Sequence, residues 1–594
     1  MNRRLFAHLS RTLTLLAAIS LAACGSDEDN DNDPANTQTD SGSGSGETDT
    51  GTEADTEADT GTEADTESDT GTEADTQADT GTEADTEADT EADTQADTQV
   101  DTEADTETDT GAGSGDTSIP GPDPLTRVTV DGLTNASADD YALNRWGLIE
   151  ASTLQTYATG WATADTAAPD AAANGRPASL NADARLIVLQ LNAAARAAGE
   201  DYIPSSPATG VYVFEIDAFR FNETRDTGLI SNSVRYQASG PTTDDWLTRY
   251  GIDLSRDFVV FAAGANTGTT GAFFQDLARA VYWLSYWGAD LRRIAILNGT
   301  IAQNYAGTLA SSKLTEGAIS NDGFSVRDLR NDHFSLTLPL EDFLTIVDSE
   351  LNATGLIEGY DRQFIIDARP TPQFLRTAGN AAFVDTLPGQ FITTAWNSTG
   401  APSNDETGKA KNYLPIEGHV KGAATFPWAN LLVDTGSNNW KYKSRADLEA
   451  LFSAAGYTPE IAVDTVLVSQ CRTNFEVQVN GFAARVILGY PTVHFDGSLV
   501  EYLSLVSNHP TSEFNLLPSD PAYVYRTDLP GRTQHYAASA NPEAPSTTED
   551  EAGVPAYNIP TGTGPTDRKV SQAVINRNAT TTRQALDEDL LYKQ

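Results

Sequence analysis

The chain has 594 residues, of which 86 are Asp or Glu and 37 are Lys or Arg, so its formal net charge at pH 7 is −49. Binding to nucleic acid needs a basic surface that neutralises phosphate groups. The charge balance therefore excludes a nucleic-acid-binding protein, and we expect no nucleic-acid partner.

The first 24 residues have the pattern of a signal peptide. Arg3, Arg4 and Arg11 give a positive start, and the apolar run over 13–23 is too short for a membrane-spanning helix. The run ends at Cys24 in a sequence that resembles a bacterial lipobox, which implies cleavage before this cysteine and its acylation. An ordinary secretory signal with a chance cysteine is the alternative.

Residues 25–120 have the composition of a disordered tether. They repeat TEADT-like units, and they contain 32 Asp and Glu and no Lys or Arg. With almost no apolar side chains to bury, such a segment does not offset the entropy of ordering. Alternating acids such as Glu57 and Asp59 raise the alternative of calcium binding. The glycine and terminal glutamate of a calcium-binding loop are not regularly placed, so we expect a disordered linker and no metal site.

Gly25, directly after the cysteine, favours the outer membrane by resemblance to bacterial lipoprotein sorting. We therefore expect a lipid-anchored protein of the cell envelope, in the outer membrane, that faces the periplasm or the cell surface.

Beyond the linker, strands and helices alternate. An apolar run at 258–261 predicts a buried strand, 262–271 a loop, the apolar spacing over 274–281 a helix, and 294–297 a second strand. An amphipathic helix is predicted over 340–347. A strand followed by a helix and another strand indicates a right-handed crossover in a parallel sheet.

The same order returns later in the chain. A strand is predicted at 364–366, and a helix with Ser444 and Asp447 as a capping box ends before Gly456. A strand over 465–469, a loop over 471–475, a helix over 479–486 closed by Gly489, and a strand over 493–495 follow.

The repeated order predicts an α/β fold with two tandem domains, each a parallel sheet flanked by helices. We place the first domain at 121–315, a connector at 316–335, the second domain at 336–545 and a C-terminal tail at 546–594. More than 450 residues of globular composition are enough for two cores.

Cys471 lies between a predicted strand and a predicted helix. With Cys24 acylated it has no cysteine to pair with, so we expect a free thiol. Backbone N–H groups of the loop and the positive end of the following helix would lower the pKa of the thiol and hold the thiolate. The alternative is an inert cysteine in the core.

The second half resembles a rhodanese domain. Short motifs follow the family's order between about residues 360 and 503, namely Asp367-Ala368-Arg369, Gly418-His419-Val420-Lys421-Gly422-Ala423, Cys471-Arg472, Gly489-Tyr490-Pro491, and Phe495-Asp496-Gly497-Ser498 followed by Glu501. The first half resembles a degenerate rhodanese domain, with Ala262, Ala263 and Gly264 where the cysteine is expected. Tandem thiosulfate and mercaptopyruvate sulfurtransferases likewise pair a silent N-terminal domain with an active one.

The resemblance implies a sulfurtransferase in which Cys471 takes sulfane sulfur from a small donor, of thiosulfate, mercaptopyruvate or polysulfide type, and passes it to a thiol or cyanide-like acceptor. It assigns donor binding to Arg472, Thr473, Asn474, Phe475, Glu476, Val477 and Arg369. Structural support is assigned to Asp367, His419 and Asp496. An internal ion pair between Asp367 and Arg369 is the alternative to donor binding by Arg369, and a structural role is the alternative for Arg472. We expect a monomer without a cofactor.

The loop departs from the family pattern at Asn474, at Glu476 and in its length, and Gln373 stands where a further basic residue is expected. A carboxylate at position 476 repels an anionic donor, which favours a neutral or cationic one. A binding module without turnover and a cysteine-based phosphatase remain as alternatives.

Overall fold

The computed structural model describes residues 124–594 except for gaps at 136–143, 169–170, 193–201, 218–220, 232, 266–269, 372–373, 375–409, 413–415, 417, 510–511, 513–514, 537–548, 551–567 and 571–573. The predicted signal peptide with Cys24, the predicted linker and Gln373 lie outside the described residues.

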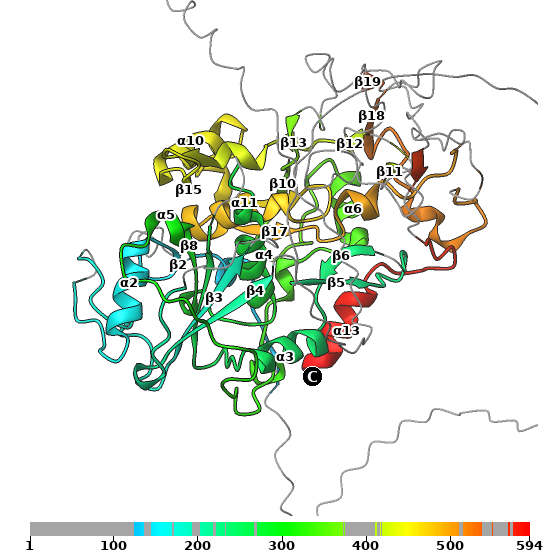
Figure 1. The fold of residues 1–594 in the computed structure, drawn as a ribbon. Helices are drawn as coiled ribbons and strands as arrows, with labels where there is room; N and C mark the ends of the chain where they lie inside the picture. Colours follow the sequence, from blue (N-terminus) through cyan, green and yellow to red (C-terminus); the bar gives the residue numbers. More distant parts are fainter. Residues whose placement is uncertain are drawn as a thin grey trace, which may run out of the picture. The chain divides into compact units, whose positions relative to one another are not determined.

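Five parallel strands form the first sheet, in the order β2 (Gly147–Ile149), β8 (Ile294–Thr300), β7 (Phe258–Ala263), β3 (Leu186–Asn192) and β4 (Val211–Asp217). The helices of this part are α2 (Ala151–Gly160), α3 (Gly240–Arg249), α4 (Phe273–Tyr286) and the short α5 (Ile301–Asn304). Figure 1 shows the strands side by side, with α4 close to them. Every residue of β7 and β8 is buried, which explains the apolar run of β7 and of the first four residues of β8.

Four parallel strands form the second sheet, in the order β13 (Ala424–Thr425), β10 (Arg362–Asp367), β16 (Thr465–Gln470) and β17 (Thr492–His494). Its helices are α6 (Leu340–Asp348), α10 (Arg445–Ala454), α11 (Glu476–Phe482) and α12 (Ser498–Tyr502). The prediction of an α/β fold with parallel sheets flanked by helices is confirmed.

The remaining strands form small sheets. Parallel pairs join β1 (Thr126–Arg127) to β9 (Asn331–Asp332) and β11 (Ala410–Asn412) to β20 (Arg568–Val570). Antiparallel pairs join β5 (Asn222–Arg225) to β6 (Ser233–Gln237) and β14 (Leu432–Asp434) to β15 (Trp440–Tyr442). An antiparallel sheet contains β12 (Gly418–Val420), β18 (Thr533–Tyr536) and β19 (Glu549–Asp550).

Predicted helix ends coincide with the observed ones where a cap or a glycine marks them. Ser444 caps α10, since its Oγ accepts the backbone N–H of Asp447 at 3.2 Å and its hydroxyl donates to the Asp447 carboxylate at 2.6 Å. Gly456 and Gly489 follow their helices with φ of 101° and 74°, a backbone that glycine adopts without strain. After α11 the helix continues as a π-helix over Ala483–Leu488.

One apolar core contains side chains from both sheets. The same buried cluster includes Leu189 and Phe261 of the first sheet and Leu467 of the second, together with Val477 of α11 and Leu277 of α4. Helices α4 and α11 contact each other within this cluster. The halves that the repeated sequence pattern predicts therefore share buried apolar surface.

The C-terminal helix α13 (Gln584–Lys593) packs onto the first half. Its Asp589 accepts hydrogen bonds from Arg225 at 2.7 Å and from the Tyr286 hydroxyl at 2.6 Å, and its Tyr592 hydroxyl donates to Asp244 at 2.6 Å. Figure 1 shows α13 next to α3, far along the chain from it. The sequence pattern assigns no role to this segment.

Within the part of the chain that the structure describes, no helix is both long and apolar enough to cross a bilayer.

Candidate functional site

Cys471 follows the last residue of β16 and begins the Cys471 loop, which we define as residues 471–475. Its sulfur accepts the backbone N–H groups of Thr473 and Val477, so amide donors from the loop and from the first turn of α11 converge on it. The thiol is free, and the side chain is fully buried. Such a pair of N–H donors is a place for negative charge on sulfur.

Backbone hydrogen bonds from the segment that follows β17 hold the backbone of the loop. The N–H groups of Leu499 and Val500 donate to the carbonyl groups of Cys471 and Arg472 at 3.1 and 3.2 Å. The N–H of Phe495 donates to the carbonyl of Ser469 at 3.0 Å. These bonds set the path of the chain at the nucleophile position.

Asn474 turns the loop. Its φ is 62°, in the left-handed region, which asparagine tolerates better than most residues. Its side-chain amide donates to Asp496, and its Oδ1 accepts from Gln478 Nε2 at 2.9 Å. The side chain thereby links the loop to α11 and to the turn after β17.

The environment raises the pKa of the Cys471 thiol to about 12. Burial is the main cause, followed by the negative charge of Glu476, while the N–H groups of Val477 and Thr473 act in the opposite direction. The expectation of a lowered pKa is therefore wrong for this buried state. The two amide donors are present as expected, but the loss of hydration and the neighbouring carboxylate outweigh them.

The structure brings the predicted loop residues together around the sulfur. Arg472, Thr473, Asn474, Phe475, Glu476 and Val477 are all buried, with exposed fractions of at most 5%. Glu476 is the first residue of α11, and it acts electrostatically on the thiol.

Asp367 and Arg369 form an internal ion pair at the end of β10. Arg369 Nε lies 2.9 and 3.0 Å from the two carboxylate oxygens of Asp367, and its Nη2 lies 2.6 Å from Oδ2. Both side chains are fully buried. The charge of Asp367 reaches the Cys471 thiol, so this pair lies beside the loop. Its geometry holds the strand end.

His419 lies on β12 and fixes a neighbouring segment. Its Nδ1 lies 3.1 Å from the carbonyl oxygen of Phe374, and the two rings stack with centroids 3.9 Å apart. Burial and the charge of Arg369 lower the pKa of His419 to about 4, so the ring is neutral at pH 7.

Asp496 connects the Cys471 loop to the first half of the chain. Besides Asn474, its Oδ1 accepts from Arg279 Nη1 of α4 at 2.7 Å, and its Oδ2 accepts the backbone N–H of Gln237 of β6 at 2.7 Å. Arg279 and Gln237 are functional candidates that the sequence analysis missed. A signal for Arg279 exists, since it is the one arginine within an otherwise largely apolar helix and such a charge needs a buried partner.

Glu501 of α12 is a further buried acid near this junction. Burial raises its pKa to about 7, while a hydrogen bond from the Thr227 side chain lowers it and the charge of Asp496 adds to the rise. The resemblance motif contains this residue, but sequence alone does not indicate that it is buried.

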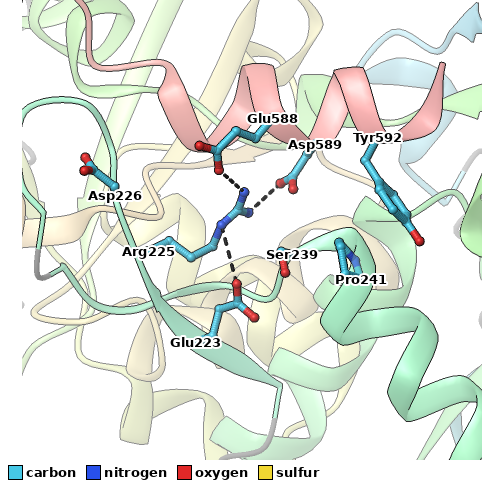
Figure 2. A pocket seen from close by; sticks show the side chains of 8 residues that line it. All are labelled: Glu223, Arg225, Asp226, Ser239, Pro241, Glu588, Asp589 and Tyr592. Atoms are coloured by element: carbon cyan, nitrogen blue, oxygen red, sulfur yellow. Dashed lines mark hydrogen bonds and ion pairs between the residues drawn. The ribbon is translucent and has the colours of Figure 1, made fainter.

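Two cavities, of about 420 and 450 Å³, lie away from the Cys471 loop. The first lies between β5, the start of α3 and α13, where Figure 2 shows Arg225 surrounded by Glu223, Glu588 and Asp589. The second lies at the opposite end of β10 and β16 from Cys471, since Arg362 and Thr465, the first residues of these strands, line it. None of the predicted site residues lines either cavity.

Among the residues that the structure describes, no cluster of His, Cys, Asp and Glu has the arrangement of a metal site.

No model of a known protein family matches the chain. Over 148 residues it is 27% identical to a protein of Synechococcus elongatus described as "Putative thiosulfate sulfurtransferase". The match covers 24% of this chain and 39% of that protein, so the chain spans well under half the length of this curated relative.

Several solved structures show a distant similarity of fold. A variant of EanB in complex with ergothioneine has 14% identity and a TM-score of 0.39, over 61% of this chain and 68% of that chain. The anaerobic ergothioneine biosynthesis enzyme from Chlorobium limicola has 12% identity and a TM-score of 0.36, over 55% and 64%. SseA from Escherichia coli, a 3-mercaptopyruvate sulfotransferase with the "Rhodanese" fold, has 18% identity and a TM-score of 0.32, over 52% and 92%. TM-scores this low carry no argument about function.

Proposed function

We propose that this protein is a rhodanese-like sulfurtransferase that carries sulfane sulfur as a persulfide on Cys471. The observation that supports the proposal is the position of the sulfur, at the end of a parallel strand, where the N–H groups of Thr473 and Val477 converge on it. The similarity to a protein described as a thiosulfate sulfurtransferase supports the same reaction class.

The proposed reaction has two steps. The Cys471 thiolate attacks the outer sulfur of the donor, the donor's bond to that sulfur breaks, and the remainder leaves with the electron pair, as sulfite does from thiosulfate. A thiol or cyanide acceptor then attacks the outer sulfur of the persulfide, the S–S bond breaks, and the thiolate returns. The N–H groups of Thr473 and Val477 stabilise the negative charge on sulfur in both steps.

The charge around the thiol supports a neutral or cationic donor. Glu476 places a carboxylate at the start of α11 that already disfavours a thiolate on Cys471, so a dianionic donor meets the same repulsion. A neutral organic trisulfide or a zwitterionic sulfane-sulfur donor fits this charge better than thiosulfate or an inorganic polysulfide, both of which are anions.

The proposal extends to the location of the protein. Cys24 would carry the lipid, and the acidic linker would hold two rhodanese-like domains, at 121–315 and 336–545, away from the outer membrane. Cys24→Ser is expected to move the protein from the membrane fraction to the soluble envelope fraction.

Sulfur transfer to cyanide tests the proposed function. Purified protein given thiosulfate, mercaptopyruvate or a polysulfide is expected to form thiocyanate, and mass spectrometry is expected to show a one-sulfur adduct on the peptide that contains Cys471. Cys471→Ser is expected to abolish both signals. Turnover that survives this substitution, or neither signal with any donor, contradicts the proposal.

The burial of the thiol favours a second candidate, a binding module without turnover. A fully buried side chain with a pKa raised to about 12 has the properties of a structural cysteine. This candidate predicts a normally folded protein that forms no adduct at Cys471 with any of the three donors.

A further inference from the structure

We infer that Arg279, which lies in the half without a cysteine, is a positioning residue for the Cys471 loop. The inference rests on the proposed function, since it assigns a role in the reaction at Cys471. The first half, which lacks a cysteine at the nucleophile position, would thus support the reaction by holding the loop of the second half.

Arg279 contacts the Cys471 loop directly and through one intermediate. Its Nη1 donates to Asp496 Oδ1 at 2.7 Å, and the same oxygen accepts the side-chain amide of Asn474. Its guanidinium also lies 5.5 Å from the centroid of the Phe475 ring and 5.2 Å from that of Tyr282. Two of the five loop residues are thus held from α4.

Loss of either partner of this contact is costly because the pair is buried. Arg279 and Asp496 are both fully buried, so their attraction is not screened by solvent and neither charge has water as a substitute partner. The other carboxylate oxygen of Asp496 is fixed by the backbone N–H of Gln237 at 2.7 Å. Asp496 therefore has a single orientation, set by the first half.

That orientation decides the shape of the amide cradle. Asn474 holds a left-handed φ of 62° while its amide is bound to Asp496, and it lies between the residues whose N–H groups reach the sulfur, Thr473 and Val477. Without Arg279, Oδ1 of Asp496 loses its charged partner while Oδ2 keeps the Gln237 N–H, so the oxygen that binds Asn474 is held less firmly. The two N–H groups then converge less well on Cys471.

A matched pair of variants tests this role. Arg279→Met removes the arginine of the buried pair with Asp496. Arg185→Met is the control, because Arg185 is also a largely buried arginine of the first half, with its Nε 2.9 Å from the fully buried Asp257. Its other hydrogen bonds go to the carbonyl groups of Gly251 and Ser320, and none goes to Asp496, Gln237 or the Cys471 loop. Both variants lose a buried ion pair, and one of them loses the loop contact.

Two readouts are expected to separate the variants. For Arg279→Met, kcat for thiocyanate formation falls roughly tenfold to a hundredfold with little change in the KM of the donor, as for a small misplacement of reacting groups. In native-state hydrogen exchange, the peptide over 471–478 exchanges faster than in the wild type. Arg185→Met changes neither, although it lowers stability to a similar extent. Arg279→Lys, which keeps the charge, recovers part of kcat.

Asn474→Ala is the second variant, for the case that Arg279→Met does not fold. It removes the hydrogen bond to Asp496 and leaves the ion pair between Arg279 and Asp496 intact. It is expected to give the same fall in kcat and the same faster exchange. If both readouts are unchanged relative to Arg185→Met, the inference is overturned. Hydrogen exchange needs no turnover. If the wild type transfers no sulfur but the loop still exchanges faster in Arg279→Met, the positioning contact stands and the proposed function is rejected.

Discussion

At the scale of single residues, Glu476 is the side chain that most distinguishes this site from a thiol activated by a helix N-terminus. Its carboxylate stands at the first residue of α11, where the helix dipole stabilises negative charge, and it raises the pKa of Cys471. The carboxylate of Glu476 and a thiolate on Cys471 therefore compete for stabilisation by the same helix end.

Glu476→Gln is expected to make Cys471 more reactive. The thiolate is the reactive form and the thiol pKa lies near 12, so the rate of alkylation rises with pH throughout the neutral and alkaline range. Removal of the carboxylate lowers that pKa, and the rate at pH 8 is expected to rise roughly severalfold to tenfold, because one pKa unit is a factor of ten. Iodoacetamide labelling of the folded protein, followed by mass spectrometry of the Cys471 peptide, measures the rate.

Glu460→Gln is the control, because Glu460 is an exposed carboxyl in the turn before β16. It is expected to leave the labelling rate unchanged. Equal rates for Glu476→Gln and the wild type would mean that the charge at position 476 does not act on the sulfur.

Glu501 gives a second residue-scale prediction, on stability. Its pKa is about 7 in the folded protein against 4.5 in the unfolded chain, so the folded state binds the proton more tightly. The contribution of protonated Glu501 to the free energy of unfolding is fully present below pH 4.5 and is lost as the pH rises through 7. Above pH 7 the loss amounts to about 3 kcal/mol, from the size of the pKa difference.

Glu501→Gln keeps the shape of the side chain and removes its titration. The variant is expected to gain stability relative to the wild type as the pH rises from 4.5 to 8, up to about 3 kcal/mol. Urea unfolding at several pH values measures the difference. A stability difference that is constant with pH would show that Glu501 keeps an ordinary pKa in the fold.

At the scale of elements, the unit that presents the sulfur is β16, the Cys471 loop and α11. The strand and the helix follow from local periodicity, and both were predicted within a few residues of their observed ends. The loop between them depends on one left-handed residue, Asn474, whose conformation is fixed by a contact with Asp496.

Substitutions at Asn474 are expected to separate backbone strain from the lost side-chain contact. Asn474→Gly and Asn474→Ala both remove the hydrogen bond to Asp496, but glycine adopts positive φ freely and alanine does not. Alanine is therefore expected to be less stable than glycine by about 1–2 kcal/mol. Thermal unfolding of both variants measures this difference. Equal stability would mean that the loop takes a different backbone conformation once the amide is gone.

The position of helix α13 in the fold does not follow from its position in the chain. It is formed by the last residues, yet its Asp589 pairs with Arg225 of β5 and with the Tyr286 hydroxyl of α4. The hydrophobic pattern of α13 is weak, but Leu586 is part of the shared apolar cluster, and the buried polar contacts add to the attachment of the helix.

At the scale of the whole molecule, both sheets contribute to one apolar cluster, so we expect them to unfold together. Leu189 of β3 and Leu467 of β16 are fully buried members of that cluster. Leu189→Ala and Leu467→Ala are each expected to cost about 2–5 kcal/mol and to shift the same single transition. Tryptophan fluorescence and far-UV circular dichroism during urea unfolding measure it.

Two resolved transitions, with each variant shifting one of them, would contradict this expectation. They would show instead that the predicted domains at 121–315 and 336–545 unfold independently. A conservative change at an exposed position, Val463→Ala, controls for nonspecific effects, since this side chain is 78% exposed.

The sequence alone determined the α/β class, the positions of β7, α4, β10, β16 and α11, and the place of Cys471 between a strand and a helix. These features are local, because apolar periodicity, caps and glycines specify strands and helices within a few residues of themselves. The tertiary structure alone decided that Arg279 reaches Asp496, that α13 packs on the first half, and that the Cys471 thiol is buried with a raised pKa. Desolvation and ion pairing depend on which distant segments come together, and periodicity along the chain does not contain that information.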